Sequence, residues 1–413
     1  MLSEWKTYTV QELIDLGMLE APMDGNHGGI HPKSSDYVDA GIPFVMANDL
    51  VQGQVDYKNC AFITEKQANT LKKGFAKPGD VLLTHKATIG RTALVSDEYE
   101  TIILTPQVTY YRIKNGISNR YLKYYFDSAP FQQLFSNWAG SGSTRAYLGI
   151  TAQRKLPIVL PPFDVQKKIA DCCGVIDDKI VVNNRINDNL LEQLDALYQE
   201  LSARATWSIV PIGDLADKVA MGPFGSNIKV STFVASGVPI ISGNHLRGYF
   251  LEEPSYNYIT EEHAEKLKNS VVYSGDIIFT HAGNIGQVAL IPDECDYPRY
   301  VLSQRQFYLR CNKEKVLPEY VTLFFHSAEG QHELLSFANQ TGVPSLAQPA
   351  SNLKKITLPV PPIQIQEEWA ALVRPLISYY QRNRLESREL AILRDTLLPK
   401  LMSGEIDVSN IGN

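Results

Sequence analysis

A glycine-rich stretch near the start of the chain carries side chains that could bind a metal ion or donate hydrogen bonds to a ligand. It reads Asp24-Gly25-Asn26-His27-Gly28-Gly29-Ile30-His31-Pro32-Lys33. Asp24, His27 and His31 are ligand types of a metal site. The hydrogen-bond donors of the stretch are Asn26, His27, His31 and Lys33. Because glycines let a backbone approach closely, as at the edge of a nucleic-acid groove, we favour a ligand-contacting loop over a metal site.

A second kind of polar segment occurs twice, each time after an apolar, strand-like run. Residues 84–91 read Thr-His-Lys-Ala-Thr-Ile-Gly-Arg, and residues 280–287 read Thr-His-Ala-Gly-Asn-Ile-Gly-Gln. Such segments lie at a strand end or in the loop beyond it. Cations there can contact phosphate, and amide side chains can bond adenine bidentately. The alternative is that Thr and His cap the strands and Ile-Gly packs a turn. The candidate contact residues are His85, Lys86, Arg91, His281, Asn284 and Gln287.

Three further glycine-containing segments are candidates. Residues 222–229 read Gly-Pro-Phe-Gly-Ser-Asn-Ile-Lys and offer backbone N–H groups and polar side chains to a phosphate. The alternative for this segment is a turn in which Phe224 is buried. Residues 140–147 and 339–345 either contact a ligand directly or act as hinges between a domain and the helix that follows. The candidates in the three segments are Ser143, Thr144, Arg145, Ser226, Asn227, Lys229, Gln340 and Thr341.

The motifs of several enzyme classes are missing from the sequence. It contains neither a Gly-x-x-x-x-Gly-Lys-Ser/Thr phosphate loop nor a His-Glu-x-x-His zinc motif. A DNA amino-methyltransferase needs Asp, Asn or Ser before Pro-Pro-aromatic, to hold the amino group of a flipped base. The aromatic candidate in this chain, residues 160–163, has Leu at that place. We therefore expect a non-catalytic chain that holds no metal or cofactor of its own.

The polar segments belong to a chain that repeats itself. The repeated pairs are Gly41–Val45 with Gly237–Ile241 and Gly79–His85 with Gly275–His281, at an offset of 196, and Pro161–Gln166 with Pro361–Gln366, at an offset of 200. A period near 200 residues is too long for a solenoid unit and fits the duplication of a whole domain with whatever follows it. Each half therefore positions its own set of polar loops.

A long heptad pattern follows each domain. Seam positions spaced alternately four and three run over residues 169–201, after a helix cap at Asp164, and again over residues 369–401. Asn183 and Asn383 occupy the same seam position. A 3.5-residue period needs a partner helix, and polar seam residues fix its register. Helices of about 38 residues are rods of roughly 57 Å. We expect them to pair antiparallel, with a domain at each end; the alternative is that each packs only on its own domain.

Composition limits the functions that the chain can perform alone. Its 413 residues carry a net charge of -6, and residues 207–350 hold 10 Lys/Arg against 15 Asp/Glu. Without an overall basic field, the isolated chain should bind nucleic acid weakly, and partners would supply phosphate neutralisation.

Five cysteines without a Cys-x-x-Cys pair indicate reduced thiols. With no apolar N-terminal signal and no run near 18 apolar residues, we expect a cytoplasmic protein without membrane contact.

The order of these motifs resembles the specificity subunit of type I restriction–modification enzymes. The resemblance covers nearly the whole chain and includes the closing stretch Leu397-Leu398-Pro399-Lys400-Leu401-Met402-Ser403-Gly404-Glu405-Ile406. It implies two target recognition domains that each read half of a split, asymmetric sequence in double-stranded DNA. It also implies that the conserved helices act as a ruler and dock two methyltransferase subunits, with restriction/translocase subunits joining through them. S-adenosylmethionine would then belong to the methyltransferase partner, and ATP and Mg to the restriction partner.

The predicted architecture is α+β, with two similar recognition domains, two long antiparallel coiled-coil helices and internal pseudo-two-fold symmetry. The expected divisions are residues 1–160 and 205–360 for the domains, 161–204 for the first spacer helix, and 361–413 for the second helix and tail. Two alternatives to DNA reading are a coiled-coil interaction scaffold and a nuclease. The nuclease is disfavoured because its candidate acidic and basic residues are not repeated with the domain.

Overall fold

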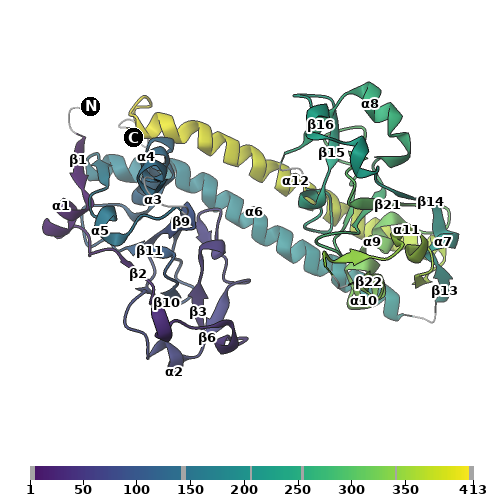
Figure 1. Cartoon of the computed structure of the whole chain (residues 1–413), viewed down its shortest axis with the longest axis horizontal. Helices are drawn as coiled ribbons and strands as arrows, with labels where there is room; N and C mark the ends of the chain where they lie inside the picture. The colour runs from purple at the N-terminus through teal and green to yellow at the C-terminus, as the bar shows by residue number, and fades with distance from the viewer. Residues whose placement is uncertain (1–4, 141–145, 205–206, 253–254, 340–341, 409–413) are drawn as a thin grey trace. The chain divides into compact units, whose positions relative to one another are not determined.

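The computed structural model divides the chain into two compact units (Figure 1). It describes residues 5–140, 146–204, 207–252, 255–339 and 342–408. Unit 1 comprises Met1–Val182 and Glu386–Asn413, and unit 2 comprises Asn183–Leu385. Both boundaries fall inside the long helices α6 (Phe163–Ala203) and α12 (Ile363–Met402). Each unit therefore consists of one domain together with a segment of both helices.

The domain of unit 1 is built on two four-stranded sheets. One has the order β2 (Met23–Asp24), β11 (Val108–Tyr111), β8 (Val81–Lys86), β9 (Thr88–Leu94), and the other β6 (Ala61–Ile63), β3 (Ile42–Val45), β10 (Ile102–Leu104), β7 (Phe75–Ala76). Smaller antiparallel sheets pair β1 (Lys6–Thr9) with β12 (Pro157–Leu160) and β4 (Leu50–Val51) with β5 (Gln54–Val55). Only β3 and β10 run parallel among the strand pairs described in this unit.

Unit 2 repeats the topology of both four-stranded sheets and of the β1–β12 pair. Its four-stranded sheets have the orders β14 (Ala216–Met221), β21 (Gln306–Cys311), β18 (Asp276–Thr280), β19 (Val288–Leu290) and β16 (Asn257–Ile259), β15 (Val238–Ile241), β20 (Tyr300–Leu302), β17 (Val271–Val272). The smaller pairs are β13 (Ser208–Pro211) with β24 (Thr357–Val360) and β22 (Ala338–Asn339) with β23 (Ser345–Leu346). The shared topology confirms the predicted duplication and the α+β class.

Helices cover one face of each β8- or β18-containing sheet. They are α3 (Asn119–Asp127) and α4 (Ala129–Gly140) in unit 1, and α9 (Pro318–His326) and α10 (Ala328–Leu335) in unit 2. Phe126, Phe131 and Phe135 stack in sequence in the core of unit 1, with centroids 4.7 and 5.7 Å apart. The short helices are α1 (Val10–Asp15), α2 (Glu65–Ala68), α5 (Ile150–Gln153), α7 (Ile212–Leu215), α8 (Glu261–Lys266) and α11 (Pro349–Leu353). Among the helices of the described ranges, none is long and apolar enough to span a membrane.

The duplicated Gly-Asp motif has a structural role. Its carboxylate lies at the start of β8 or β18 and accepts hydrogen bonds from an arginine at the end of the neighbouring strand, β11 or β21. Arg112 Nη2 lies 2.7 Å from Asp80 Oδ2, and Arg310 Nη2 lies 2.6 Å from Asp276 Oδ2. A buried carboxylate is tolerated only when it is paired in this way. The motif therefore fixes the central strands, and its charge is not available to a ligand.

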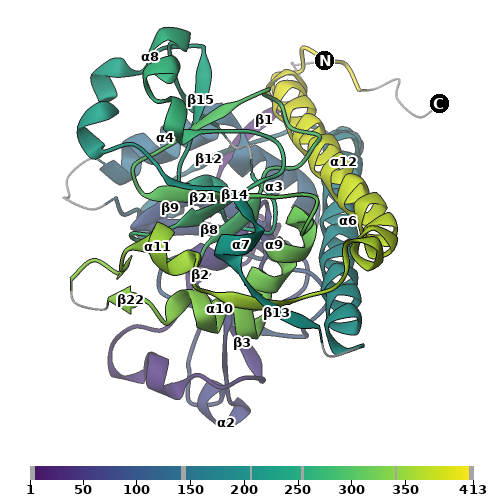
Figure 2. The ribbon, with the colours of Figure 1, turned by 90° about the vertical axis from the view of Figure 1, so that its right-hand side faces the viewer.

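Within unit 2, α6 and α12 pair antiparallel, as Figure 2 shows for the teal and yellow helices. Trp369 Nε1 donates to Leu197 O at 3.1 Å, and Asn383 Nδ2 donates to Asn187 Oδ1 at 3.0 Å. The residue number therefore falls along one helix as it rises along the other. The asparagine pair is a polar layer in the seam, as the polar positions of the heptad pattern predicted.

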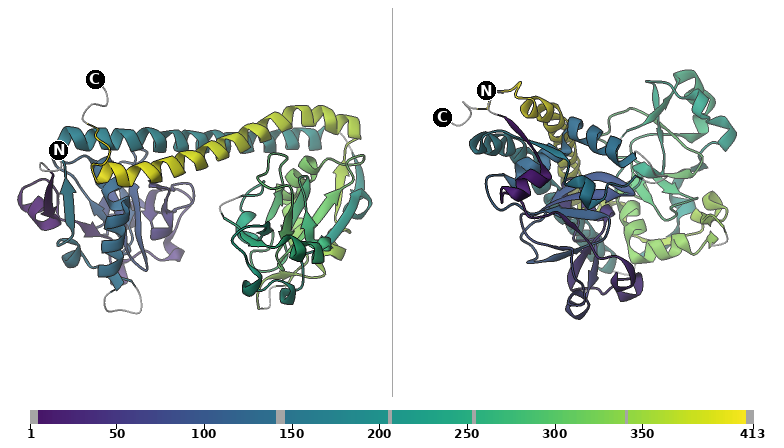
Figure 3. Two further views of the ribbon diagram at one scale, coloured as in Figure 1. Left: turned by 90° about the horizontal axis from the view of Figure 1, so that it is seen from above. Right: turned by 60° about the vertical axis from the view of Figure 1, so that its left-hand side comes forward.

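Within unit 1, the start of α6 lies beside the end of α12 (Figure 3). Lys179 Nζ lies 3.1 Å from Glu386 Oε2, and Arg394 Nη1 donates to Asp177 Oδ1 at 2.7 Å. This order again makes the helices antiparallel. The antiparallel pairing predicted from the heptads is confirmed in both units.

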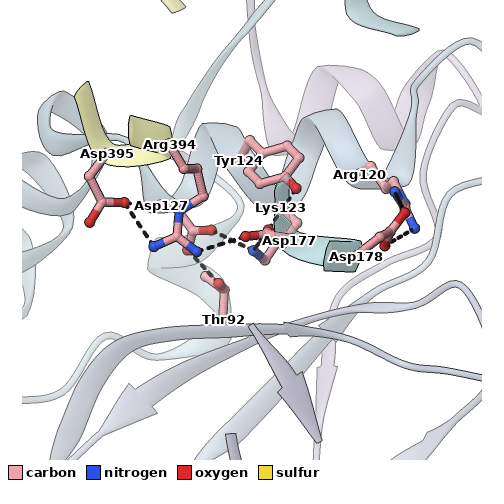
Figure 4. Close-up of polar contacts among 9 residues, drawn as sticks. All are labelled: Thr92, Arg120, Lys123, Tyr124, Asp127, Asp177, Asp178, Arg394 and Asp395. Atoms are coloured by element: carbon pink, nitrogen blue, oxygen red, sulfur yellow. Dashed lines mark hydrogen bonds and ion pairs between the residues drawn. The ribbon is translucent and has the colours of Figure 1, made fainter. Parts of the chain in front are cut away.

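A polar cluster joins α3 to both long helices in unit 1 (Figure 4). Lys123, which is 6% exposed, lies 3.3 Å from Asp177 Oδ2 and 3.0 Å from Asp127 Oδ2. Tyr124 Oη donates to Asp177 at 2.7 Å, opposite the bond from Arg394. Asp177 of α6 thus accepts hydrogen bonds from the recognition domain and from α12 at once. The cluster fixes the domain of unit 1 to its helix pair.

Candidate nucleic-acid interface

In unit 1 two of the predicted loops meet at the turn between β10 and β11. Gly25 N donates to Thr105 O at 3.3 Å, and His85 N donates to Gln107 O at 2.9 Å. A Cβ atom on Gly25 would lie 1.8 Å from the carbonyl oxygen of Leu104, so the loop can approach the turn only with glycine there. The glycine-rich stretch and the end of β8 therefore belong to one surface.

The tip of the β8–β9 hairpin adds a third segment to this surface. Ala87 has a positive φ of 65° at the tip, and its N–H donates to Ala146 O at 3.0 Å. Lys86 Nζ lies 6.0 Å from the ring centroid of Tyr147, which is 50% exposed. An exposed cation thus lies near an exposed ring. Sequence analysis had not selected Tyr147.

Unit 2 builds the corresponding surface around the turn between β20 and β21. Gly222 N donates to Gln306 O at 2.8 Å, and His281 N donates to Arg305 O at 2.9 Å. The loop after β18 is also hydrogen bonded to residues 344–346. Three predicted segments that are far apart in the sequence are therefore brought together in this unit as well.

Apart from the buried Asp24 at the start of the glycine-rich stretch, the segments that build the two surfaces contain no acidic residue. In unit 1 the acid-free stretches are 25–35, 81–96, 101–126 and 128–163, and in unit 2 they are 218–251, 277–292, 297–313 and 334–366. All 15 Asp and Glu residues between positions 207 and 350 lie outside these stretches. The net charge of -6 is thus carried by other parts of the chain. This spacing of the acidic residues is the sequence signal that could have identified both surfaces.

The unit 1 surface exposes three of the predicted cations. Lys33, Lys86 and Arg91 are exposed, and Arg91 Nη1 makes only a long bond of 3.4 Å to Ala47 O among the contacts described for its side chain. His27 has a side chain that is 51% exposed. Four predicted residues are therefore accessible to a ligand in unit 1.

The structure does not assemble the alternative metal site. His27 Nε2 donates to Asp24 Oδ2 at 2.9 Å, and Lys73 also pairs with this carboxylate. His31 packs against Phe44 instead, with ring centroids 5.4 Å apart. Across the described ranges, no group of three His, Cys, Asp or Glu side chains is arranged to hold a metal ion.

Two of the predicted contact residues lie in the interior, and their role must be corrected. Asn26 is 3% exposed; its Nδ2 donates to Lys73 O and its Oδ1 accepts from Lys72 N at 3.0 Å. His85 is fully buried and its Nδ1 donates to Leu148 O at 3.1 Å. Burial lowers the pKa of His85, so its ring is neutral at neutral pH. Both residues hold loops in place. Through its bond to Lys72 N, Asn26 also holds the exposed Lys72 beside the glycine-rich stretch.

The unit 2 surface exposes amides as well as cations. Asn227, Lys229 and Asn284 are exposed, whereas Gln287 is partly buried and its Oε1 accepts from Thr280 Oγ1 at 3.2 Å. Gln304 and Arg305 in the central turn are also exposed, although sequence analysis had not selected them.

The histidine of the unit 2 surface supports the central turn. His281 is partly buried and its Nε2 donates to Gln304 O at 3.1 Å. Burial lowers the pKa of His281, as it does that of His85. The remaining predicted contact residues, Ser143, Thr144, Arg145, Gln340 and Thr341, lie outside the described residues, as does the side chain of Ser226.

Comparison with known proteins gives matches over nearly the whole chain. A family model described as the type I restriction modification DNA specificity domain matches twice, over residues 3–192 and 205–390. The MjaIX specificity subunit of a type I restriction enzyme from Methanocaldococcus jannaschii is 24% identical, covering 98% of this chain and 95% of its own. The MjaVIII specificity subunit of the same organism is 21% identical over 91% of each chain. The S subunit of a type I restriction–modification system from M. genitalium has a similar fold, with a TM-score of 0.53 and 14% identity over 96% of each chain.

Proposed function

The chain belongs to the family of type I restriction–modification DNA specificity proteins, and from this premise we propose that each unit reads one half of a bipartite target in duplex DNA. The observation that carries the proposal is the pair of acid-free surfaces, built from corresponding loops around corresponding turns. Phosphate contacts need such a surface free of repulsive charge, and base reading needs donors and acceptors exposed on it.

The two surfaces carry different side chains on the same backbone scaffold. Unit 1 presents the cations Lys33, Lys86 and Arg91, whereas unit 2 presents the amides Asn227 and Asn284 beside the cations Lys229 and Arg305. Lys and Arg pair with guanine or phosphate, while Asn and Gln pair with adenine. Different half-sites follow from these differences, so the target is asymmetric.

We assign the chemistry of the complex to partner subunits. Two methyltransferase subunits would dock on the helices and bind S-adenosylmethionine, and restriction/translocase subunits would bring ATP and Mg. The net charge of -6 supports this division, because strong phosphate neutralisation by the chain alone is not available. The complex would act in the cytoplasm, where its DNA substrate lies. A coiled-coil scaffold that reads no DNA would have no use for two acid-free loop surfaces.

Variants of the unit 2 amides test the proposal. Asn284→Ala and Gln287→Ala, assembled with methyltransferase subunits in a host, should each relax discrimination at one position of one half-site. The loss of a bidentate contact costs about 1–3 kcal/mol. Methylome sequencing of the host reads the relaxation directly.

Glu314→Ala is the matched control, because Glu314 is exposed in unit 2 but lies beyond the opposite end of β21 from the central turn. It should leave the methylated sequence unchanged. If the amide variants were as silent as the control, unit 2 would not read DNA through this surface. Equal weakening on every sequence would reduce the amides to phosphate contacts.

A further inference from the structure

The most exposed aromatic side chain described in unit 2 lies on the candidate interface. Phe224 is 85% exposed, and Val230 in the same segment is 82% exposed. The alternative of a turn with Phe224 buried is therefore wrong. An apolar ring that is exposed to water does not stabilise the fold. Its exposure therefore favours a role in contacting a ligand over a role in the core.

The backbone beside Phe224 is fixed on both sides. Gly222 N donates to Gln306 O at 2.8 Å, and a Cβ atom on Gly222 would lie 2.1 Å from a backbone oxygen of the same turn. On the other side, His263 Nε2 donates to Asn227 O at 2.8 Å, and Asn227 N donates to Phe224 O at 2.9 Å. The ring thus extends from an anchored loop, and little entropy is lost when it binds.

The corresponding place in unit 1 also holds an exposed ring. His27 directly precedes the single-turn helix Gly28–Ile30, and Phe224 directly precedes the single-turn helix Gly225–Asn227. Both residues have extended backbone, with ψ of 162° and 146°. The ring of His27 is polar and bonded to Asp24, whereas that of Phe224 has no polar atom. The two units therefore present a planar group at the same position with different chemistry.

The surroundings of Phe224 fit DNA better than a protein partner. Lys229 and Arg305 are exposed on the same surface, and residues 218–251 contain no Asp or Glu. An apolar protein contact would need a continuous apolar patch, but the exposed Asn227 and Lys229 lie between Phe224 and Val230 in the segment. Rings and apolar wedges inserted at a base step unstack it and are held by flanking phosphate contacts.

We propose that Phe224 stacks against a base of the half-site read by unit 2 and opens one base step there. The inference rests on the proposed DNA-reading function. It adds a contact whose strength depends on how easily a base step opens, as well as on which bases form the step. Pyrimidine–purine steps are the easiest to open, so one should occur at this position.

Fluorescence of 2-aminopurine tests the proposal in the complete complex with methyltransferase subunits. The target is first identified by methylome sequencing, and the probe is then placed at successive positions of the half-site other than the methylated adenine. The wild-type complex should brighten the probe at one step. Phe224→Ala should abolish that signal and weaken binding about ten-fold, whereas Phe224→Trp should restore both.

Val230→Ala is the matched control, because it removes exposed apolar surface from the same segment without removing a ring; binding should stay within about two-fold. Unchanged probe fluorescence and affinity in Phe224→Ala would overturn the inference while leaving DNA reading intact. Reduced assembly with methyltransferase subunits, with DNA contacts unaltered, would overturn it by showing a protein contact. Absence of target binding by the wild-type complex would instead refute the proposed function.

Discussion

At the scale of single residues, the buried rings of His85 and His326 act as neutral donors to backbone carbonyls. His85 bonds Leu148 O, and His326 Nε2 donates to Val288 O at 2.9 Å while its ring stacks on Tyr249 at 3.9 Å. Burial lowers the pKa of both, to about 4 for His326. Protonation would place a charge in the interior, so burial disfavours the charged ring even though its N–H would still donate to the carbonyl.

The stability of unit 2 should therefore fall in acid through His326. Because the folded pKa of about 4 lies below the ordinary value of 6.5, the contribution is complete above pH 6.5 and is lost as the pH falls towards 4. His326→Phe keeps the stacking on Tyr249 and removes the titration. Between pH 7.5 and 4.5, urea denaturation should show the wild type losing on the order of 2 kcal/mol more than the variant. Parallel pH profiles of the two proteins would contradict this assignment.

The sequence located the candidate loops but not the burial of each side chain within them. Lys86 and Asn284 are exposed as expected, whereas His85 is not. The reason is that β8 lies between two cores: Leu83 packs in one and Leu82 in the other. In a strand that is covered on both faces, apolar and polar residues do not alternate. The sequence therefore gives no pattern from which buried and exposed positions can be told apart.

At the scale of elements, the seam between α6 and α12 differs between the units. The heptads predicted the helices closely, since their apolar spacing is a local signal. Asp177 and Arg394 form an ion pair in unit 1, but the residues 200 positions away, Ile377 and Leu194, are apolar and belong to the core of unit 2.

Strand pairing could not be predicted from the sequence as the helices were. The parallel pairing of β3 with β10 joins segments almost 60 residues apart, and no local pattern specifies it.

Removing the two members of the ion pair should have unequal effects. Asp177→Ile leaves Lys123 and Arg394 without their shared partner, and removing one partner of a buried pair costs about 3 kcal/mol or more. Arg394→Leu should cost less, because Lys123 and Tyr124 still satisfy the carboxylate. The double variant, which copies the apolar pair of unit 2, should recover part of the loss.

Urea denaturation of the four proteins gives the coupling energy between the two positions. Lys179→Ala, which breaks an exposed ion pair between the same two helices in unit 1, should change the free energy of unfolding by less than about 1 kcal/mol. Additive effects of Asp177→Ile and Arg394→Leu would show that the ion pair does not stabilise the junction between the domain and the helices.

At the scale of the whole molecule, duplication gives the chain two candidate surfaces with independent side chains. The family resemblance predicted this organisation, and the matching topologies confirm that the domain occurs twice. The distribution of charge reconciles a net charge of -6 with DNA binding, because the acidic residues lie outside the loops that form the surfaces. The bases recognised do not follow from the sequence, since they depend on how each side chain meets a groove edge.

Exchange of one recognition domain tests the central claim most directly. Residues 1–160 are replaced by the equivalent domain of another specificity subunit; the segment must extend to Leu160, because β1 pairs with β12 across residues 6–9 and 157–160. The methylated sequence in a host that carries the chimera is then read by methylome sequencing. We predict that one half-site takes the donor's sequence while the other half-site and the spacing remain unchanged. A change in both half-sites, or in neither, would contradict the account of two independent reading units.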